Sequence, residues 1–206
     1  MIAIIDYDAG NIKSVEKAIL ALGEEVVVTS DADTILTADG VILPGVGAFG
    51  DAMKKLKDYD LVDVIRRVAE SGKPFMGICL GLQLLFDSSE ESPGVQGLGI
   101  LKGKIVRIPE GEGIKVPHIG WNSLEFPKKS RLFKGITPGS YVYFVHSYYL
   151  QAQDKEIVAA TAEYGVEIHA AVEIENIFAC QFHPEKSSDI GLKLLRNFIQ
   201  VTKEGK

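Results

Sequence analysis

The sequence predicts an α/β fold: an open, mostly parallel, twisted sheet with helices on both faces. Two features of the first half indicate it. Strands that are apolar at every position alternate with amphipathic helical segments, and such strands are typical of parallel sheets covered on both sides. In the second half, strand and hairpin patterns follow one another without intervening helices, which predicts a mixed or antiparallel extension.

The first half supplies the parallel part of the predicted sheet. The expected strands cover residues 2–6, 25–30, 40–45 and 74–78. The expected helices cover residues 10–23, 61–74 and 80–89, whose apolar residues recur with helical spacing. Gly23 ends the first helix, and Gly72 with Pro74 ends the second.

The second half supplies the extension and a closing helix. The expected strands and hairpins cover residues 103–108, 141–150, 156–165 and 169–182. The closing helix is expected over residues 187–200, capped by Ser187 or Ser188, with an inward apolar face formed by Ile190, Leu194, Leu195 and Phe198. No linker, repeat or low-complexity segment divides the chain, so we expect one domain over residues 1–206.

The composition excludes several classes of function. The net charge is −6 and the pI is about 5.3, which argues against a nucleic-acid surface. The chain reaches Asp6 too early for a signal peptide, and no apolar run approaches the ~20 residues that span a bilayer. We therefore expect a cytoplasmic protein with neither a membrane nor a nucleic-acid partner. The spacing of cysteines and histidines matches no metal site, and we expect no metal and no cofactor.

Cys79 lies at the junction between a predicted strand and a predicted helix, flanked by Gly77 and Gly81. This pattern has the form of a nucleophile elbow, in which the glycines allow a sharp turn and the central side chain stands above the sheet. A helix N-terminus favours thiolate over thiol, and the amide of Leu80 becomes an oxyanion donor. The alternative is a small apolar residue in an ordinary turn.

A thiolate nucleophile needs a base and a group that orients the base. His183 and Glu185 are two residues apart in a stretch expected to be extended, so their side chains project to one side. The alternative is a surface turn. His118 and His146 are competing bases, but neither has a carboxylate two residues away. Cys180 lies in an apolar run without a glycine turn and is predicted to be a core residue.

A glycine-rich loop, Pro44 to Gly47, follows the predicted strand 40–45. Such a loop brings backbone amides close to a ligand, and Gly45 or Val46 is a candidate for the second oxyanion donor. Phosphate binding is a second interpretation, although the lysine of a P-loop is missing. An ordinary turn is a third.

Together these stretches resemble the class I, triad-type glutamine amidotransferase family, through GICLGLQ, FHPE and the glycine loop. The similarity extends over essentially the whole chain. It is greatest to the family's glutaminase subunits of imidazole glycerol phosphate synthases, in the stretches DYDAGNIKSV, PGVGAFGDAM, KVPHIGWN, YFVHSYY and CQFHPEKSS. The resemblance implies a flavodoxin-like fold and a single glutamine amidotransferase domain.

The resemblance also implies a reaction, the hydrolysis of L-glutamine to L-glutamate and ammonia through a thioester on Cys79. His183 would move the proton, and Glu185 would orient the imidazole. The amides of Leu80 and of the glycine loop would hold the oxyanion. The residues implied in substrate binding are Gly47, Gln83, His146, Ser147 and Tyr148.

The implied partner is a (β/α)₈ cyclase subunit that uses the ammonia to make imidazole glycerol phosphate and aminoimidazole carboxamide ribonucleotide in histidine biosynthesis. Asn11, Trp121 and Lys186 would face this partner. The alternatives are core packing for Trp121 and a solvated charge for Lys186. We expect low activity without the liganded partner, and we hypothesise that the isolated subunit lacks a complete oxyanion hole.

Other functions stay open from the sequence. The chain could serve anthranilate, pyridoxal phosphate or GMP synthesis, act as a stand-alone γ-glutamyl hydrolase, or be a non-catalytic binding module. PHIGWN and FVHSYY favour the histidine route. The intact Cys79, His183 and Glu185 argue against the binding module.

Overall fold

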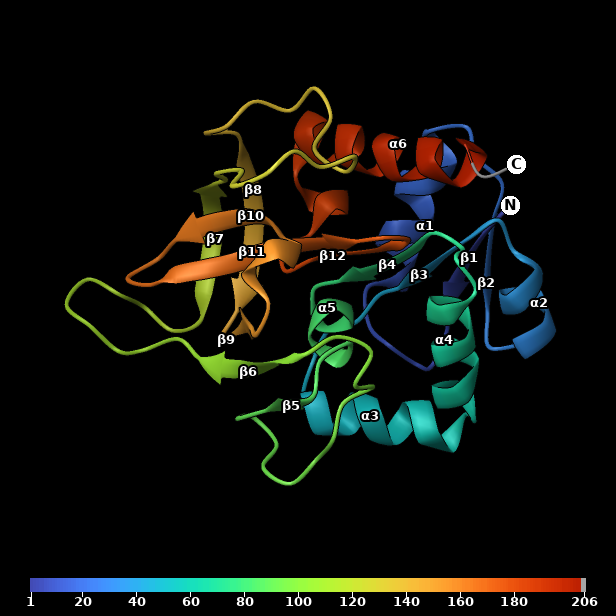
Figure 1. Ribbon diagram of the computed structural model, residues 1–206, viewed down its shortest axis with the longest axis horizontal. Coiled ribbons are helices and arrows are strands. Elements are labelled where there is room, and N and C mark those ends of the chain that lie inside the picture. The colour runs from blue at the N-terminus through green and yellow to red at the C-terminus, as the bar shows by residue number, and fades with distance from the viewer. Residues whose placement is uncertain (205–206) are drawn as a thin grey trace.

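The structure of the protein, a computed structural model, describes residues 1–204 (Figure 1). Within them the main sheet has seven strands in the order β10-β11-β12-β4-β3-β1-β2. Its parallel strands are β12 (Ile177–Cys180), β4 (Phe75–Ile78), β3 (Gly40–Leu43), β1 (Ile2–Ile5) and β2 (Val26–Thr29). β11 (Glu167–Ile174) and β10 (Val158–Glu163) continue the sheet in antiparallel pairing. The predicted fold class is confirmed, including its antiparallel extension.

The central strands are apolar throughout because both faces of the sheet are covered. Every residue of β1, β3 and β4 is buried. Along β1 the side chains alternate, so that Ile2 and Ile4 belong to one core cluster and Ala3 and Ile5 to the other. A strand with two buried faces has no polar side to show in its sequence, which is why these segments appear as continuous apolar runs.

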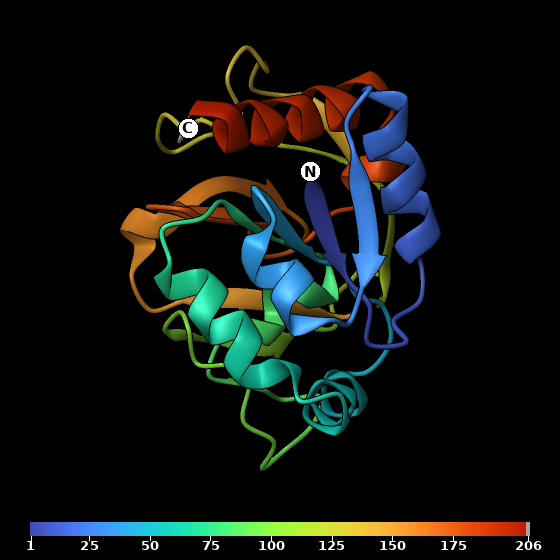
Figure 2. The same ribbon diagram turned by 90° about the vertical axis from the view of Figure 1, so that its right-hand side faces the viewer.

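Helices cover the two faces of the sheet (Figures 1 and 2). The first core cluster contains residues of α1 (Ile12–Ala21) and α6 (Ser188–Glu204). The second contains residues of α2 (Ala32–Thr37), α3 (Phe49–Asp58) and α4 (Leu61–Glu70). The two clusters lie on opposite sides of β1, β3 and β4, which makes the domain a three-layer α/β/α arrangement.

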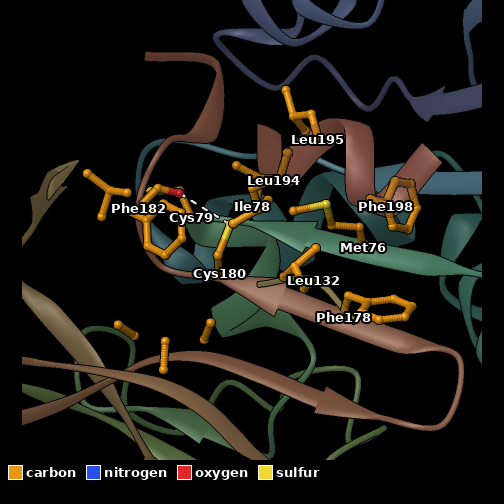
Figure 3. Packing of buried hydrophobic residues seen from close by; sticks show 14 of the residues in the cluster. Met76, Ile78, Cys79, Leu132, Phe178, Cys180, Phe182, Leu194, Leu195 and Phe198 are labelled. Carbon is orange, nitrogen blue, oxygen red and sulfur yellow. Dashed lines mark hydrogen bonds between the residues drawn. The ribbon is translucent and has the colours of Figure 1, made fainter. Parts of the chain in front are cut away.

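Figure 3 shows the core beneath α6, where Met76 and Phe178 of the sheet lie against Leu194 and Phe198 of the helix. The rings of Phe178 and Phe198 meet edge to face with centroids 5.8 Å apart. The inward face predicted for the closing helix is confirmed, because Leu194, Leu195 and Phe198 are all buried and Ile190 is partly buried against the same cluster.

Two small sheets adjoin the main one. One contains β5 (Ser88–Ser89), β6 (Gly103–Arg107) and β9 (Tyr148–Ala152), and the other contains β7 (His118–Ser123) and β8 (Tyr141–His146). The short helical segments are α5 (Leu80–Leu84), η1 (Lys155–Ile157) and η2 (Pro184–Lys186). Over residues 1–204, no helix is long and apolar enough to cross a membrane.

Two predicted elements have different boundaries in the structure. The helix expected over residues 80–89 ends at Leu84, because Ser88 and Ser89 pair with β6 instead. The segment expected over residues 141–150, predicted only as strand or hairpin, contains β8 and β9, which are separated by Ser147 and belong to different sheets. Both changes depend on strands distant in sequence, which a local apolar pattern does not reveal.

Three of the longer elements, α2, α3 and β7, were not predicted, and neither were the short β5, η1 and η2. α3 carries a helical signal, since its buried residues Phe49, Ala52, Met53 and Leu56 share one face, but no helix was predicted after the glycine-rich loop. α2 buries only Ile35, and β7 contains Gly120, so neither shows a clear period.

Candidate active site

Cys79 lies at an elbow between β4 and α5. Its backbone has φ 55° and ψ −110°, so this non-glycine residue takes the strained conformation of the turn itself. The glycines serve close packing instead. A Cβ on Gly77 would lie 2.7 Å from the carbonyl oxygen of Gly81, and one on Gly81 would lie 1.9 Å from the carbonyl oxygen of Leu43. The motif therefore needs small residues for contact between strand and helix, and Cys79 makes the turn.

Parallel pairing of β4 and β12 brings the two sequence motifs to one edge of the sheet. Ile78 lies opposite Cys180 in the register, and the amide of Cys79 donates to the carbonyl oxygen of Cys180 at 2.8 Å. Figure 3 shows Cys79 next to Phe182 at this end of the strands. Ligands of open α/β sheets bind outside this carboxyl edge. Cys180 itself is fully buried in the core, as predicted.

The imidazole of His183 is held by Glu185 and Asn11. His183 Nδ1 lies 2.7 Å from Glu185 Oε1, and Asn11 Nδ2 donates to the same oxygen at 2.6 Å. His183 is extended as predicted, with φ −100° and ψ 97°, but the extended stretch ends there, because Glu185 lies in the 3-10 turn η2, which Pro184 begins. Ser187, expected to cap the last helix, closes this turn by donating to the carbonyl oxygen of His183 at 2.6 Å. The turn folds the carboxylate back onto the ring.

Burial and charge act in opposite directions on His183. Burial lowers the pKa of its imidazole, but the side chains of Cys79 and Glu185 raise it, with a net rise to about 9. His183 Nε2 and Glu185 Oε2 are buried without a hydrogen-bond partner among the described residues. An imidazole with one nitrogen oriented by a carboxylate and the other unpartnered near a thiol can accept that thiol's proton.

The competing histidines form a neutral pair. His118 Nδ1 lies 3.1 Å from His146 Nε2, and His146 Nδ1 lies 2.9 Å from the carbonyl oxygen of Tyr148. Because a carbonyl only accepts, His146 carries its hydrogen on Nδ1, and His118 donates to its Nε2. Burial lowers the pKa to about 4 for His118 and to about 3 for His146. Neither has the carboxylate partner that orients His183.

A cavity of 410 Å³ opens beside the sulfur of Cys79. The predicted site residues that line it are Val46, Gly47, Cys79, Leu80, Gln83, His146, Ser147 and Tyr148. The lining residues that the sequence did not reveal are Glu91, Pro117 and Val145. No local motif marks Glu91, whose carboxylate accepts from the amide of Phe49 at 2.7 Å across a tertiary contact. Within residues 1–204 no cluster of side chains could hold a metal ion.

Two buried amides lie behind the sulfur. Gln83 Nε2 donates to the carbonyl oxygen of Tyr148 at 3.1 Å and to Gln181 Oε1 at 3.0 Å. Gln181 Nε2 in turn donates to Cys79 Sγ at 3.8 Å. Gln181 is fully buried and was missed from sequence. The available signal was a polar residue between the buried Cys180 and His183, where an apolar run would otherwise continue.

The amide of Leu80, a predicted oxyanion donor, is already occupied. It donates to the carbonyl oxygen of Gly45 at 3.2 Å, so the glycine loop presents a carbonyl to the start of α5. In the same loop Gly47 has φ 99°, a conformation that favours glycine. Val46 is 39% exposed and lines the cavity, and a Cβ on Gly10 would lie 2.6 Å from its Cγ2. The loop therefore lies between the cavity and the segment that joins β1 to α1.

The three residues expected to face a partner have different environments. Trp121 on β7 is 51% exposed, so its core-packing alternative is wrong, and Lys186 is also exposed. Ile119 and Tyr141 are exposed on the same β7–β8 ribbon, which gives it an apolar outer face. Asn11, in contrast, directs its amide to Glu185.

Comparison with known proteins covers nearly the whole chain. The family model described as glutamine amidotransferase class-I matches residues 3–201. The chain belongs to the class-I glutamine amidotransferase family. It is an enzyme of that class, as the sequence resemblance implied.

Its relatives include proteins named imidazole glycerol phosphate synthase subunit HisH. The relative from Moorella thermoacetica is 54% identical over 202 residues, which cover 98% of this chain and 95% of the relative. The relative from Aquifex aeolicus is 53% identical over 196 residues, which cover 95% of this chain and 94% of the relative. The predicted resemblance to this branch of the family is confirmed.

Solved structures agree on the fold. A glutamine amidotransferase superposes with a TM-score of 0.76 at 20% identity and covers 98% of both chains. The structure of PurLQS from Thermotoga maritima superposes with a TM-score of 0.74 at 21% identity, and the match covers 97% of both chains. At these identities the likeness shows the fold alone.

Proposed function

We propose that the protein hydrolyses L-glutamine to L-glutamate and ammonia at Cys79 and supplies the ammonia to a cyclase partner in histidine biosynthesis. One observation carries the proposal. Cys79 lines a cavity next to an imidazole, that of His183, whose far nitrogen lies 2.7 Å from the buried carboxylate of Glu185. This arrangement occurs in a chain that is about half identical to HisH subunits.

The proposed reaction begins with attack by the sulfur of Cys79 on the side-chain amide carbon of glutamine. His183 accepts the thiol proton on Nε2 and transfers it to the amide nitrogen as the C–N bond breaks and ammonia leaves. Water then attacks the thioester carbon and gives a proton to Nε2 of His183, the C–S bond breaks, and His183 returns that proton to the sulfur as glutamate leaves. Glu185, close to Nδ1, stabilises the imidazolium in each half of the reaction.

Gln83 has a restricted role in the proposed substrate site. Both hydrogens of its Nε2 are used, one by the carbonyl oxygen of Tyr148 and one by Gln181 Oε1. Only its Oε1 is left, and this oxygen accepts. We propose that Gln83 binds the α-ammonium of glutamine, and that the backbone of Gly47 and Ser147 at the cavity wall binds the α-carboxylate.

The proposed oxyanion hole requires a rearrangement of the glycine loop. The amide of Leu80 bonds to the carbonyl oxygen of Gly45, which must move before the amide can serve an oxyanion. The carbonyl of Gly45 and the amide of Val46 belong to the same peptide group. Rotation of this peptide would withdraw the carbonyl from the amide of Leu80 and present the amide of Val46 to the oxyanion. We propose that partner binding drives this rotation, so that the isolated chain is a slow glutaminase.

The proposed partner surface is the outer face of the β7–β8 ribbon together with Lys186. Ile119, Trp121 and Tyr141 expose large apolar side chains there, and aromatic residues are enriched at protein interfaces. By the family resemblance the partner is a (β/α)₈ cyclase. Asn11, which the resemblance places at the partner surface, also donates a hydrogen bond to Glu185 within the site.

The test is glutamine consumption by the purified chain, alone and with the cyclase partner and its nucleotide. We expect slow turnover by the chain alone, a large increase with the liganded cyclase, and none in Cys79→Ser. Equal turnover with and without the cyclase would refute the regulatory proposal and favour a stand-alone hydrolase. Stimulation only by an anthranilate, pyridoxal phosphate or GMP synthase would refute the histidine route.

A further inference from the structure

The sulfur of Cys79 has a buried neighbour that the proposed reaction leaves unused. Gln181 is fully buried, and its Nε2 lies 3.8 Å from Cys79 Sγ. It follows β12 at the same edge of the sheet as the nucleophile, and its backbone amide donates to the carbonyl oxygen of Ala170 at 2.8 Å. Its backbone is therefore held by the sheet, and its side chain is held by the amide of Gln83.

One backbone group determines the direction of the hydrogen bonds at this position. The carbonyl oxygen of Tyr148 can only accept, so Gln83 presents its NH₂ group to it. The same NH₂ group faces the side chain of Gln181 at 3.0 Å, so Gln181 must present its oxygen there. The NH₂ group of Gln181 is consequently directed at the sulfur of Cys79. A side-chain amide in isolation has two orientations, but these contacts admit one.

The carbonyl of Tyr148 is itself held in place. His146 donates to it from Nδ1 at 2.9 Å, and His118 supports His146 at 3.1 Å. The ring of His118 is stacked on that of Tyr164, with centroids 3.8 Å apart. The orientation of the amide behind the sulfur therefore depends on a connected polar network within the core.

We propose that Gln181 is a further catalytic residue, which donates a hydrogen bond to the sulfur of Cys79 and stabilises its thiolate. A hydrogen bond to an ionised acceptor is stronger than one to a neutral acceptor, so a fixed donor favours thiolate over thiol. The side-chain amide of Gln181 does not ionise, so it continues to donate to the sulfur while His183 transfers its proton. The catalytic meaning of this contact depends on the proposed glutaminase activity, but its test does not.

The test measures alkylation of Cys79 by iodoacetamide as a function of pH, without glutamine or partner, by mass spectrometry of the peptide. Gln181→Met keeps the length of the side chain and removes the donor. Gln181→Glu directs an oxygen at the sulfur. The control is Thr202→Val, which removes a buried hydroxyl that donates to the carbonyl oxygen of Ile199 in α6.

We expect alkylation at pH 7 to be about tenfold slower in Gln181→Met than in the wild type. The midpoint of the pH profile should shift upward in Gln181→Met and further in Gln181→Glu, and should not move in Thr202→Val. Folding of each variant is checked by circular dichroism. A wild-type midpoint in the folded Gln181 variants would overturn the proposal, because a purely structural role does not change the ionisation of the sulfur.

A second measurement needs no Gln181 variant. In ¹⁵N-labelled wild-type protein, the side-chain amide resonance of Gln181 should shift as the thiol ionises, and this shift should vanish in Cys79→Ser. A Gln181 resonance independent of pH in the wild type would refute the donor. If the protein does not hydrolyse glutamine but the Gln181 resonance still shifts with pH, Gln181 is a hydrogen-bond donor to the thiolate in an enzyme of another specificity. Failure of the glutaminase proposal and failure of the Gln181 proposal are therefore distinguishable.

Discussion

Replacing Asn11 with glycine should weaken the site without straining the backbone. Asn11 has φ 70° and ψ 5° at the start of α1, a left-handed conformation that glycine adopts readily. Its Nδ2 donates at 2.6 Å to Glu185 Oε1, the oxygen that also lies against His183. The substitution leaves His183 as the remaining hydrogen-bond partner of that carboxylate within the described chain.

The magnitude follows from the type of bond that is lost. A hydrogen bond to a charged group contributes about 1.5–3 kcal/mol. Relief of the left-handed strain at Asn11 offsets about 1 kcal/mol or less. The net loss in the free energy of unfolding is about 1–2 kcal/mol, which corresponds to about 2–8 °C in Tm for a domain of this size. Because Glu185 then orients the imidazole less well, we expect turnover to fall about tenfold.

The matched control is Asp60→Gly. Asp60 lies at the start of α4 with φ 55° and ψ 27°, and like Asn11 it makes no side-chain capping bond. Glycine relieves the same strain there without touching the site, so we expect wild-type turnover and a change in stability below about 1 kcal/mol. The assays are thermal melts and glutamine turnover with the liganded cyclase. If Asn11→Gly and Asp60→Gly have the same Tm and the same glutamine turnover, the contact between Asn11 and Glu185 supports neither the fold nor the reaction.

Three further predictions concern close packing, pH and the glycine loop. Gly81→Ala places a Cβ 1.9 Å from the carbonyl oxygen of Leu43, so its Tm should fall by about 5 °C or more, whereas Gly111→Ala, whose nearest neighbour is 3.5 Å away, should melt within about 2 °C of the wild type. The pKa of His183 is raised from 6.5 to about 9 on folding, so the stability that its protonation contributes is complete below pH 6.5 and is lost as the pH rises through 9. Urea unfolding should therefore show that the wild type loses more stability than His183→Gln over this pH range. Equal losses in the two proteins would contradict the raised pKa of His183. Gly47→Ala has open space for its Cβ but φ 99°, so the fold should persist while turnover with the liganded cyclase drops about tenfold, and full activation would exclude a glycine-dependent loop rotation.

The predicted helices and strands match the structure where the apolar residues of a segment follow one clear pattern. The buried strands β1, β3 and β4 were predictable because both of their faces meet apolar layers. The helix expected over residues 80–89 was too long because its last part pairs with a strand that lies across a tertiary contact. Such competition between helix and strand is decided by the partner strand, which a local window does not contain.

The site residues divide in the same way. Cys79 and His183 could be singled out as candidates because few residue types can serve as nucleophile and base, and each has a characteristic neighbourhood. The predicted contact between Glu185 and His183 is present, but a 3-10 turn and not an extended strand brings the two side chains together. Gln181 was missed because its role comes from contacts with side chains distant in sequence.

The sequence by itself determined the α/β layering and the family, and it singled out the candidate reactive side chains, because period and residue type are properties of the chain alone. Only the tertiary structure decided how those groups are oriented. Asn11 reaches Glu185 across 174 residues of sequence, and Gln181 reaches Cys79 across 102. The amide of Leu80 is occupied by Gly45 of another loop. Directions and occupancies of hydrogen bonds arise from packing between distant segments, so they exist only once the sheet has brought those segments to the same edge.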